Sequence, residues 1–296
     1  MAYTTIDDPS AYFKVQLYTG TGSSHAVSFN DTDTNMQPDM VWIKQRSDTN
    51  DHNLFDAVRG TGKLIRPNGT NAVGDTSEVV KSFDSDGFTC GTNSSLNGST
   101  STYVAWCWKA GTTSGITTTG ANITPSAYSM NATSGISIIK YEGNGTDGTN
   151  TAHALGAVPH VIICKRLENS NYWAVYHHKN TSAPNTDYLV LNATDATSDA
   201  GLWKDTDPTS VYFRHDNSTS VNANGEDMVA YLFTSIQGFS KFGKYTGNVN
   251  ADGVFIYLGF KPALFIVKET GNAEPWVMYD NSKTIRKCKL LGSLPS

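Results

Sequence analysis

Three segments of the chain repeat one pattern of hydrophobic and polar positions. Each begins with a proline, continues through a short apolar run to a lysine six residues later, and then passes through polar residues into a second apolar segment. Apolar runs rich in β-branched and aromatic residues predict buried β-strands, and proline is tolerated at a strand's first position. The segments begin at Gln37, Val158 and Lys261, and their prolines and lysines are Pro38 and Lys44, Pro159 and Lys165, and Pro262 and Lys268.

An aromatic residue lies eleven positions after each of these lysines. The three are Phe55, Tyr176 and Tyr279, and the second and third segments also share a tryptophan three residues earlier, Trp173 and Trp276. In WAVYHH and WVMYDN apolar and polar residues alternate, which is typical of a half-buried strand. Each segment therefore predicts a β-hairpin. Aromatic residues that recur at one position are expected to pack in a core, and stacking on sugar rings is the alternative.

Similar opening and closing elements flank the hairpins. Ahead of each proline an apolar stretch runs into tyrosine and glycine, in VQLYTG from Val15, IIKYEG from Ile138 and KFGKYTG from Lys241. After the first two hairpins, NGSTSTYVAWCW from Asn97 aligns with NANGEDMVAYLF from Asn222. The third segment has no such closing element, so we expect this chain to be the front part of a longer protein. Completion of the last unit by another chain is the alternative.

The closing element TYVAWCWKA predicts a strand that is covered on both faces. Alternation divides its residues into two sets that are both mostly apolar, Tyr103, Ala105 and Cys107 on one face, and Val104, Trp106 and Trp108 on the other. A strand with two apolar faces lies between other layers of a folded domain. We expect Trp106 and the aligned Tyr231 to be equivalent core residues.

These patterns define the expected architecture. No window keeps helical periodicity over three turns, so we expect an all-β fold of tandem antiparallel β-sandwich (jelly-roll-like) domains with an incomplete third copy. The Gly-, Thr- and Ser-rich stretch between the two complete units is the best candidate for a linker. The expected divisions are an N-terminal segment (1–13), a first β-sandwich repeat (14–112), a linker or edge strand (113–134), a second β-sandwich repeat (135–238) and a partial third repeat (239–296).

Composition narrows the classes of function. Only 17% of the 296 residues are charged, the formal net charge is -5, and no basic block is long enough to follow a phosphate backbone. This argues against nucleic-acid binding. No apolar run reaches the length of about 18 residues that a transmembrane helix needs. The first residues lack the basic and apolar parts of a secretory signal, so we expect neither membrane insertion nor secretion.

The stretch SFDSDGFTCG raises the question of a metal loop. Asp84 and Asp86 lie close to Gly87, but the spacing and closing glutamate of a calcium loop are missing. A hairpin turn is favoured, with aspartate hydrogen-bonded to its own backbone and glycine at positive φ. An ion held between two or more segments is the alternative. The seven histidines form no metal motif and are expected on the surface or in packing: His25, His52, His153, His160, His177, His178 and His215.

The remaining candidate chemistry is weak. Cys90, Cys107, Cys164 and Cys288 are widely spaced, so free thiols made in a reducing compartment are expected rather than disulfides or zinc ligands. The chain has no GxSxG elbow, and its glycine-rich pieces precede no helix that could present an N-terminus to phosphate. Paired glycosidase carboxylates could arise only through the fold. We therefore expect no catalytic, cofactor-binding or metal-binding residues, no cofactor and no enzyme activity.

Several of these elements resemble a known domain. MAYTTIDDPSAYF with YTGTG, KSFDSDGFTCG and YVAWCWKAG are similar to a repeat domain of virion structural proteins in marine tailed bacteriophages, where it occurs in tandem copies. The resemblance implies a tail-fibre-like appendage in the virion, assembled in the bacterial cytoplasm, with a role in host attachment. A head decoration or knob protein is the alternative, and a surface-polysaccharide depolymerase is the second.

The same resemblance implies partners. Residues 1–13 would dock on other virion proteins, and loops or a distal tip would contact a glycan or protein of the host surface. Fibres of this kind are commonly trimers, so a homotrimer is expected. The second unit lacks the DSDG turn of the first, which argues that Asp84 and Asp86 are not a required metal site.

Overall fold

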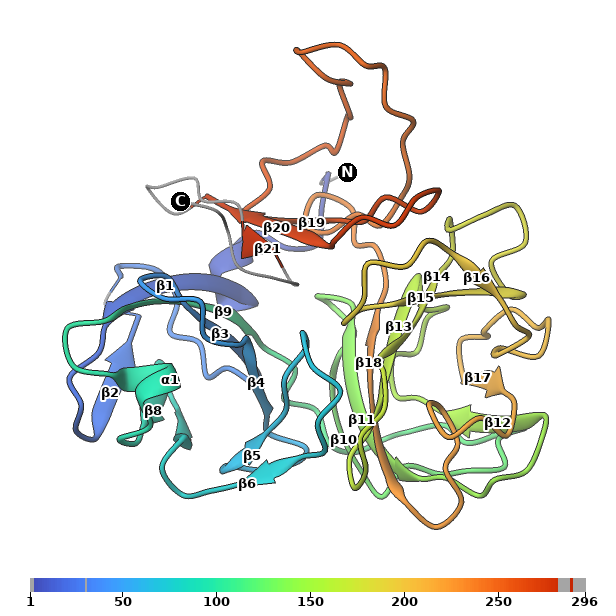
Figure 1. The fold of residues 1–296 in the computed structure, drawn as a ribbon, viewed down its shortest axis with the longest axis horizontal. Coiled ribbons are helices and arrows are strands. Elements are labelled where there is room, and N and C mark those ends of the chain that lie inside the picture. The colour runs from blue at the N-terminus through green and yellow to red at the C-terminus, as the bar shows by residue number, and fades with distance from the viewer. Residues whose placement is uncertain (1–2, 30, 282–287, 290–296) are drawn as a thin grey trace.

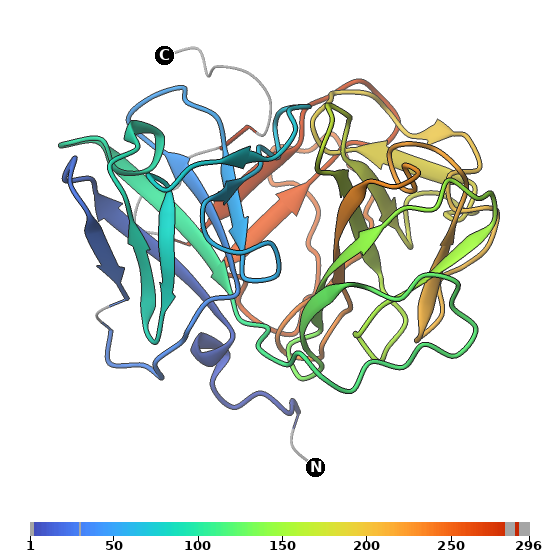
Figure 2. The same ribbon diagram turned by 90° about the horizontal axis from the view of Figure 1, so that it is seen from below.

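The computed structural model describes residues 3–29, 31–281 and the backbone of 288–289. Its regular elements are twenty-one β-strands with one short helix, α1 (Ser94–Asn97), and one 3-10 turn, η1 (Pro9–Ala11). All pairings between these strands are antiparallel, and the all-β class expected from the sequence is confirmed. Figures 1 and 2 show two lobes side by side, with a smaller third part lying across the junction between them.

The first lobe packs a four-stranded sheet against a three-stranded one. Across the larger sheet the order is β1 (Phe13–Thr19), β9 (Thr102–Trp108), β3 (Met40–Gln45) and β4 (Asn53–Asp56). The smaller sheet contains β2 (His25–Ser28), β8 (Gly87–Cys90) and β7 (Val80–Asp84), and a further ribbon contains β5 (Lys63–Leu64) and β6 (Gly74–Asp75).

The second lobe has the same central strand order in a larger sheet. Its strands are β10 (Ala127–Asn131), β11 (Ile136–Glu142), β18 (Asp227–Phe233), β13 (Val161–Arg166), β14 (Ala174–His177), β15 (Asp187–Val190) and β16 (Ser198–Asp199). A two-stranded ribbon of β12 (Thr149–Ala152) and β17 (Tyr212–His215) covers one face. Within the stretch expected to be a linker or edge strand, β10 is an edge strand of this sheet.

The third part is a hairpin with one added strand. It consists of β19 (Leu264–Val267), β20 (Val277–Asp280) and β21 (Cys288–Lys289). All three predicted hairpins form, and they share one register, because Phe55 lies opposite Val41, Tyr176 opposite Ile162, and Tyr279 opposite Phe265. In each hairpin the first strand begins two residues after the proline, at Met40, Val161 and Leu264, so the expectation of proline at the first strand position is wrong.

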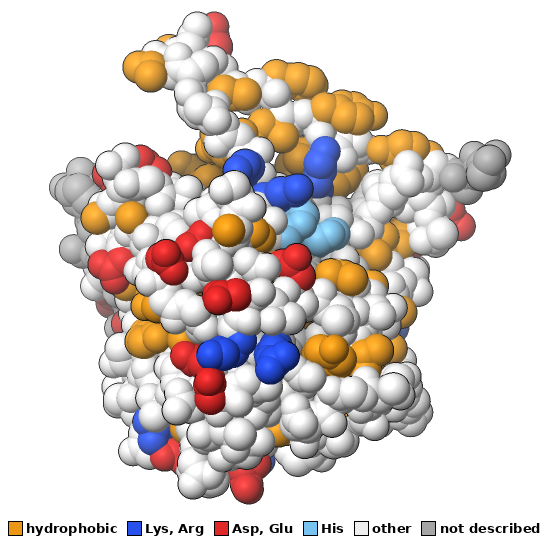
Figure 3. Space-filling model, turned by 90° about the vertical axis from the view of Figure 1, so that its right-hand side faces the viewer, with side chains coloured by type: hydrophobic (Ala, Val, Ile, Leu, Met, Phe, Trp, Pro, Cys, Tyr) orange, Lys and Arg blue, Asp and Glu red, His pale blue; other side chains and the backbone are white. Residues whose placement is uncertain are grey.

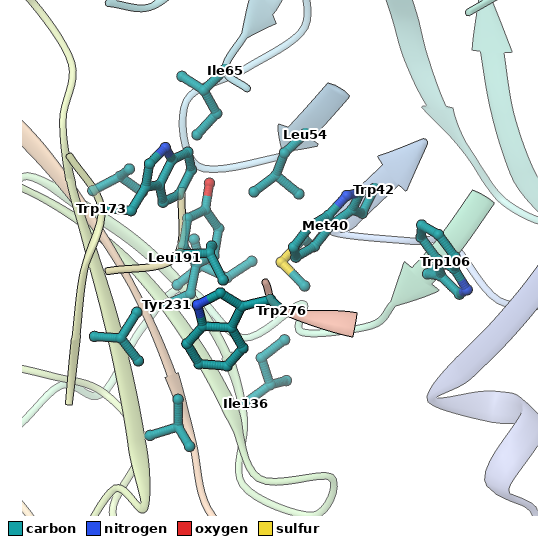
Figure 4. Close-up of a cluster of buried hydrophobic side chains, with 14 of the residues drawn as sticks. Met40, Trp42, Leu54, Ile65, Trp106, Ile136, Trp173, Leu191, Tyr231 and Trp276 are labelled. Carbon is teal, nitrogen blue, oxygen red and sulfur yellow. The ribbon is translucent and has the colours of Figure 1, made fainter. Parts of the chain in front are cut away.

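Buried side chains form two lobe interiors and one cluster shared by all three parts, which we call the central core (Figure 4). The prediction for β9 is confirmed: Tyr103, Ala105 and Cys107 face the interior of the first lobe, whereas Val104 and Trp106 face the central core. Its sheet is therefore covered on both sides. Each part contributes residues to the central core: Trp42 and Trp106 come from the first lobe, Trp173 and Tyr231 from the second, and Trp276 and Met278 from the third part.

The N-terminal segment packs on the rest of the chain. Asp8 caps η1 by accepting a hydrogen bond from Ser10 N, and the Ile6 side chain is buried. The ring of Tyr12 contacts that of Phe239 edge to face, with 6.1 Å between centroids. Residues 6–12 are thus held against the chain that leads into the third part.

Candidate functional site

The DSDG stretch is a tight hairpin turn, as the sequence predicted. Asp84 pairs with Gly87 across the β7–β8 hairpin, and Gly87 has φ of 132°. The expected bond from aspartate to its own backbone is not what the Asp86 side chain makes, because its Oδ1 accepts from the distant Met36 N at 3.1 Å. The Asp84 carboxylate accepts from the Ser82 and Thr89 hydroxyls. Among the described residues, no group of three or more His, Cys, Asp or Glu side chains could hold a metal ion.

Gly87 is required by close approach of β2. A Cβ at this position would lie 2.1 Å from the Val27 carbonyl oxygen, and its φ is one that residues with a side chain rarely adopt. Gly87→Ala is therefore expected to lower the free energy of unfolding by at least about 2 kcal/mol in a urea titration. Gly243→Ala is the control, because a Cβ there meets open space. Equal unfolding midpoints for the two variants would contradict the prediction.

The recurring tryptophans bind one part of the chain to another. Trp173 Nε1 of the second lobe donates to Arg66 O and Gly69 O of the first, each at 3.1 Å. Trp276 Nε1 of the third part donates to Val190 O of the second lobe at 2.9 Å. Both indoles are buried. The prediction that these aromatics pack in a core is confirmed, and neither ring presents a face for a sugar.

Trp106 of β9 and Tyr231 of β18 make a second set of hydrogen bonds between parts of the chain. Tyr231 Oη donates to Asp56 Oδ2 at 2.5 Å, and Trp106 Nε1 donates to Asp280 Oδ2 at 3.2 Å. Asp56 and Asp280 follow the recurring aromatic of their hairpins, and His177 occupies this position in the second lobe. Two equivalent positions of the repeat therefore form both contacts. The aromatic residue of β18 bonds the second lobe to the first, and the aromatic residue of β9 bonds the first lobe to the third part.

The recurring lysines form hydrogen bonds near the ends of their strands, and the second and third also contact the preceding part. Each donates its ammonium to the carbonyl of the next residue, with Gln45 O, Arg166 O and Glu269 O as acceptors for Lys44, Lys165 and Lys268. Lys165 also donates to Thr70 O and Lys268 to Thr194 O, each at 3.2 Å. Burial lowers the pKa of Lys165 to about 8. The sequence showed that these lysines recur, but gave no sign of this role.

The fold gathers three histidines that sequence reasoning treated as scattered. The rings of His160 and His178 lie 4.1 Å apart, and His177 lies 5.4 Å from His178. His160 Nδ1 accepts from Ser235 N at 2.8 Å. Histidine side chains lie together on the face shown in Figure 3. A hollow of about 480 Å³ beside them is lined by residues that include His160, Tyr176, His178, Pro184 and Asp207.

Burial favours the neutral form of each histidine in this group. Burial lowers the pKa of His160 and of His178, and lowers that of His177 to about 4. Neutral imidazoles can donate or accept one hydrogen bond at each nitrogen, so the hollow suits an uncharged polar ligand better than an acidic one. The sequence offered one signal for this group of histidines. His160 precedes the first strand of the predicted hairpin, and His177 and His178 lie at the end of its second strand, so the hairpin brings them together.

Two other histidines make stability depend on pH. Burial lowers the pKa of His153 and of His215 to about 4, whereas an unfolded chain titrates its histidines near 6.5. The unfolded state therefore binds more protons between these values. The stabilisation is complete above about pH 6.5 and falls as the pH approaches 4, by up to roughly 3 kcal/mol per histidine. Urea titrations between these limits measure it, and a flat profile would contradict it.

Three cysteines are free and buried, namely Cys90, Cys107 and Cys164. Burial raises the pKa of Cys90 and of Cys164 to about 12. They are therefore thiols rather than reactive thiolates at pH 7. The free thiols expected from the sequence are confirmed at these positions, and the side chain of Cys288 lies outside the described residues.

Comparison with known proteins identifies the family of the chain but gives no function for it. The fold and the recurring contacts define an all-β protein whose repeated residues serve packing between its parts. A family model described as a domain of unknown function (DUF7483) matches residues 8–290, and the chain belongs to this family. No curated protein and no solved structure matches it. In the described part, no helix is long and apolar enough to cross a membrane.

Proposed function

We propose that the protein is a non-catalytic structural component of a phage virion, a tail-fibre-like appendage with a role in host attachment. One observation carries this proposal: the polar and aromatic residues that recur along the chain form interfaces between its own parts. Trp173, Trp276, Lys165 and Lys268 each donate to a backbone carbonyl of the preceding part. Interlocked β-modules resist separation, which suits a load-bearing appendage. The sequence resemblance described above supplies the virion context.

The proposal includes partners and location. Other virion proteins would contact the N-terminal segment, residues 1–13, together with the surface on which it packs around Phe239. Homotrimers would present their distal loops to a glycan or protein of the host surface. The hollow lined by His160 and His178 is the described surface that we propose for such a ligand, and the Asp207 carboxylate in its lining disfavours an acidic one.

Electron microscopy of purified virions labelled with an antibody against residues 1–30 tests the proposal. Label on the tail is the expected result, and label on the head would favour the decoration or knob protein instead. Purified virions that carry neither the label nor the protein itself on an immunoblot would contradict a virion component of either kind. Incubation with host polysaccharide is expected to release no oligosaccharide, and release would favour the depolymerase.

A further inference from the structure

Among the described residues, the sheet of the third part has an open edge along β19. In the first lobe the seven-residue strand β9 pairs with β1 on one side and β3 on the other, and in the second lobe β18 pairs in the same way with β11 and β13. We call β9 and β18 the closing strands. In the described residues β19 pairs with β20 alone. Residues 241–247, which align with segments of β1 and β11, form no strand.

Backbone N–H groups of the neighbouring chain donate to carbonyls at both ends of each closing strand, and the open edge of β19 lacks such acceptors among the described residues. Asp39 N donates to Trp108 O and His160 N to Phe233 O, each at 2.8 Å. At the other end Arg46 N donates to Thr102 O at 2.7 Å and Leu167 N to Asp227 O at 3.0 Å. The third part has Ala263 and Thr270 at these positions. Neither of their N–H groups has a described acceptor.

Apolar side chains beside this edge are exposed where their counterparts are buried. Phe265 is 39% exposed, whereas Val41 and Ile162 at the same hairpin position are 0% and 1% exposed. Ile266 is also 39% exposed, against 5% for Trp42. Phe255, in the loop that precedes β19, is 89% exposed. Hydrophobic side chains accordingly gather at the top of the face in Figure 3. Exposed apolar side chains that gather on one surface are typical of interaction sites, including those for protein segments.

We propose that the open edge of β19 binds a β-strand of the closing type presented by a partner polypeptide. An extended segment added to a free sheet edge gains main-chain hydrogen bonds, and pockets for alternate side chains select its sequence. The two closing strands define that sequence as seven residues with Val-Ala-aromatic at the centre.

Charge favours the β18 version of this strand. Lys140 of β11 forms an ion pair with Asp227, the first residue of β18, at 2.7 Å. Lys244 holds the position of Lys140 in the third part and has no ion-pair partner among the described residues. If residues 241–247 paired with the bound strand as β11 pairs with β18, an acidic residue at the start of that strand would meet this ammonium.

The bound strand would also complete the set of bonds between the three parts. Tyr231 reaches Asp56, and Trp106 reaches Asp280, so the aromatic of a third closing strand would be directed at His177. His177 Nδ1 accepts from Lys179 N, which leaves Nε2 for a tyrosine hydroxyl. The His177 side chain is half-buried in this structure.

A synthetic peptide copying residues 224–236 tests the proposal on the whole protein. Hydrogen exchange at the amides of Ala263, Ile266 and Thr270 is expected to slow at least about tenfold when the peptide binds. The control peptide carries Val229→Ser and Tyr231→Ser and is expected to give no protection. Lys244→Glu in the protein is expected to weaken peptide binding by about twofold to fivefold, and Asp227→Lys in the peptide to restore it.

Three results would overturn the proposal. Unchanged exchange at about 1 mM peptide would show that the edge has no useful affinity for such a strand. Protection confined to the neighbours of β18 would show that the peptide displaces that strand instead. Protection without peptide that rises with protein concentration would show that two copies of this chain pair at the edge.

Discussion

Trp106→Ala is expected to lower the free energy of unfolding by about 3 to 5 kcal/mol. The Trp106 side chain is fully buried at the junction of the first lobe and the third part, and its ring centroid lies 6.4 Å from that of Trp42. Truncation removes a large apolar surface, leaves a cavity and deletes the indole donor to Asp280. Rigid neighbours in two sheets prevent the site from collapsing. Urea or thermal unfolding measures the loss.

The control for this variant is Tyr245→Ala. Tyr245 is a large aromatic that is 48% exposed, so its removal is expected to change stability by less than about 0.5 kcal/mol. An unchanged melting profile for Trp106→Ala would place its ring on an accessible surface, where it would be free to bind a ligand.

Asp56→Ala is expected to lower the free energy of unfolding by a similar amount, about 3 to 5 kcal/mol. Arg59 Nε lies 2.6 Å from Asp56 Oδ2, and both side chains are almost completely buried. Burial alone would lower the pKa of Arg59, but the Asp56 carboxylate outweighs this and raises it. Without that carboxylate the guanidinium keeps its charge inside the core, where its partners are the neutral carbonyls of Lys63 and Leu54 and the Tyr231 hydroxyl.

Two further variants separate the contributions at this site. Tyr231→Phe deletes only the hydroxyl donor to Asp56 and is expected to lower stability by about 1 to 2 kcal/mol. Asp75→Ala removes the exposed partner of Lys63 and is expected to have an effect below about 1 kcal/mol. If Asp56→Ala lowered the free energy of unfolding no more than Asp75→Ala does, the buried Asp56 carboxylate would not stabilise the interface between the lobes. Urea unfolding of all three variants at pH 7 makes the comparison.

Much of the fold was predictable because it is encoded in local alternation. The apolar run after each proline and the alternating segment behind it gave three hairpins, and their common register follows from the equal spacing of lysine and aromatic. The two apolar faces of β9 also gave its place between two layers. Side-chain direction reverses at each strand residue, so such patterns report burial directly.

The contacts between parts were not predictable in this way. Asp86 bonds to Met36, fifty residues away in the chain, and Tyr231 bonds to Asp56 across two lobes. The His160 and His178 rings meet only because their hairpin strands are neighbours. Nothing in the spacing of such residues fixes how one sheet packs on another.

By itself the sequence determined an all-β chain with recurring hairpins, free thiols and a buried closing strand. Only the tertiary structure decided that the recurring tryptophans and lysines connect successive parts, that His160 and His178 line one hollow, and that β19 pairs on one side alone among the described residues. The physical reason is that local periodicity specifies which side chains are buried, whereas the partners they meet depend on the packing of sheets from distant segments.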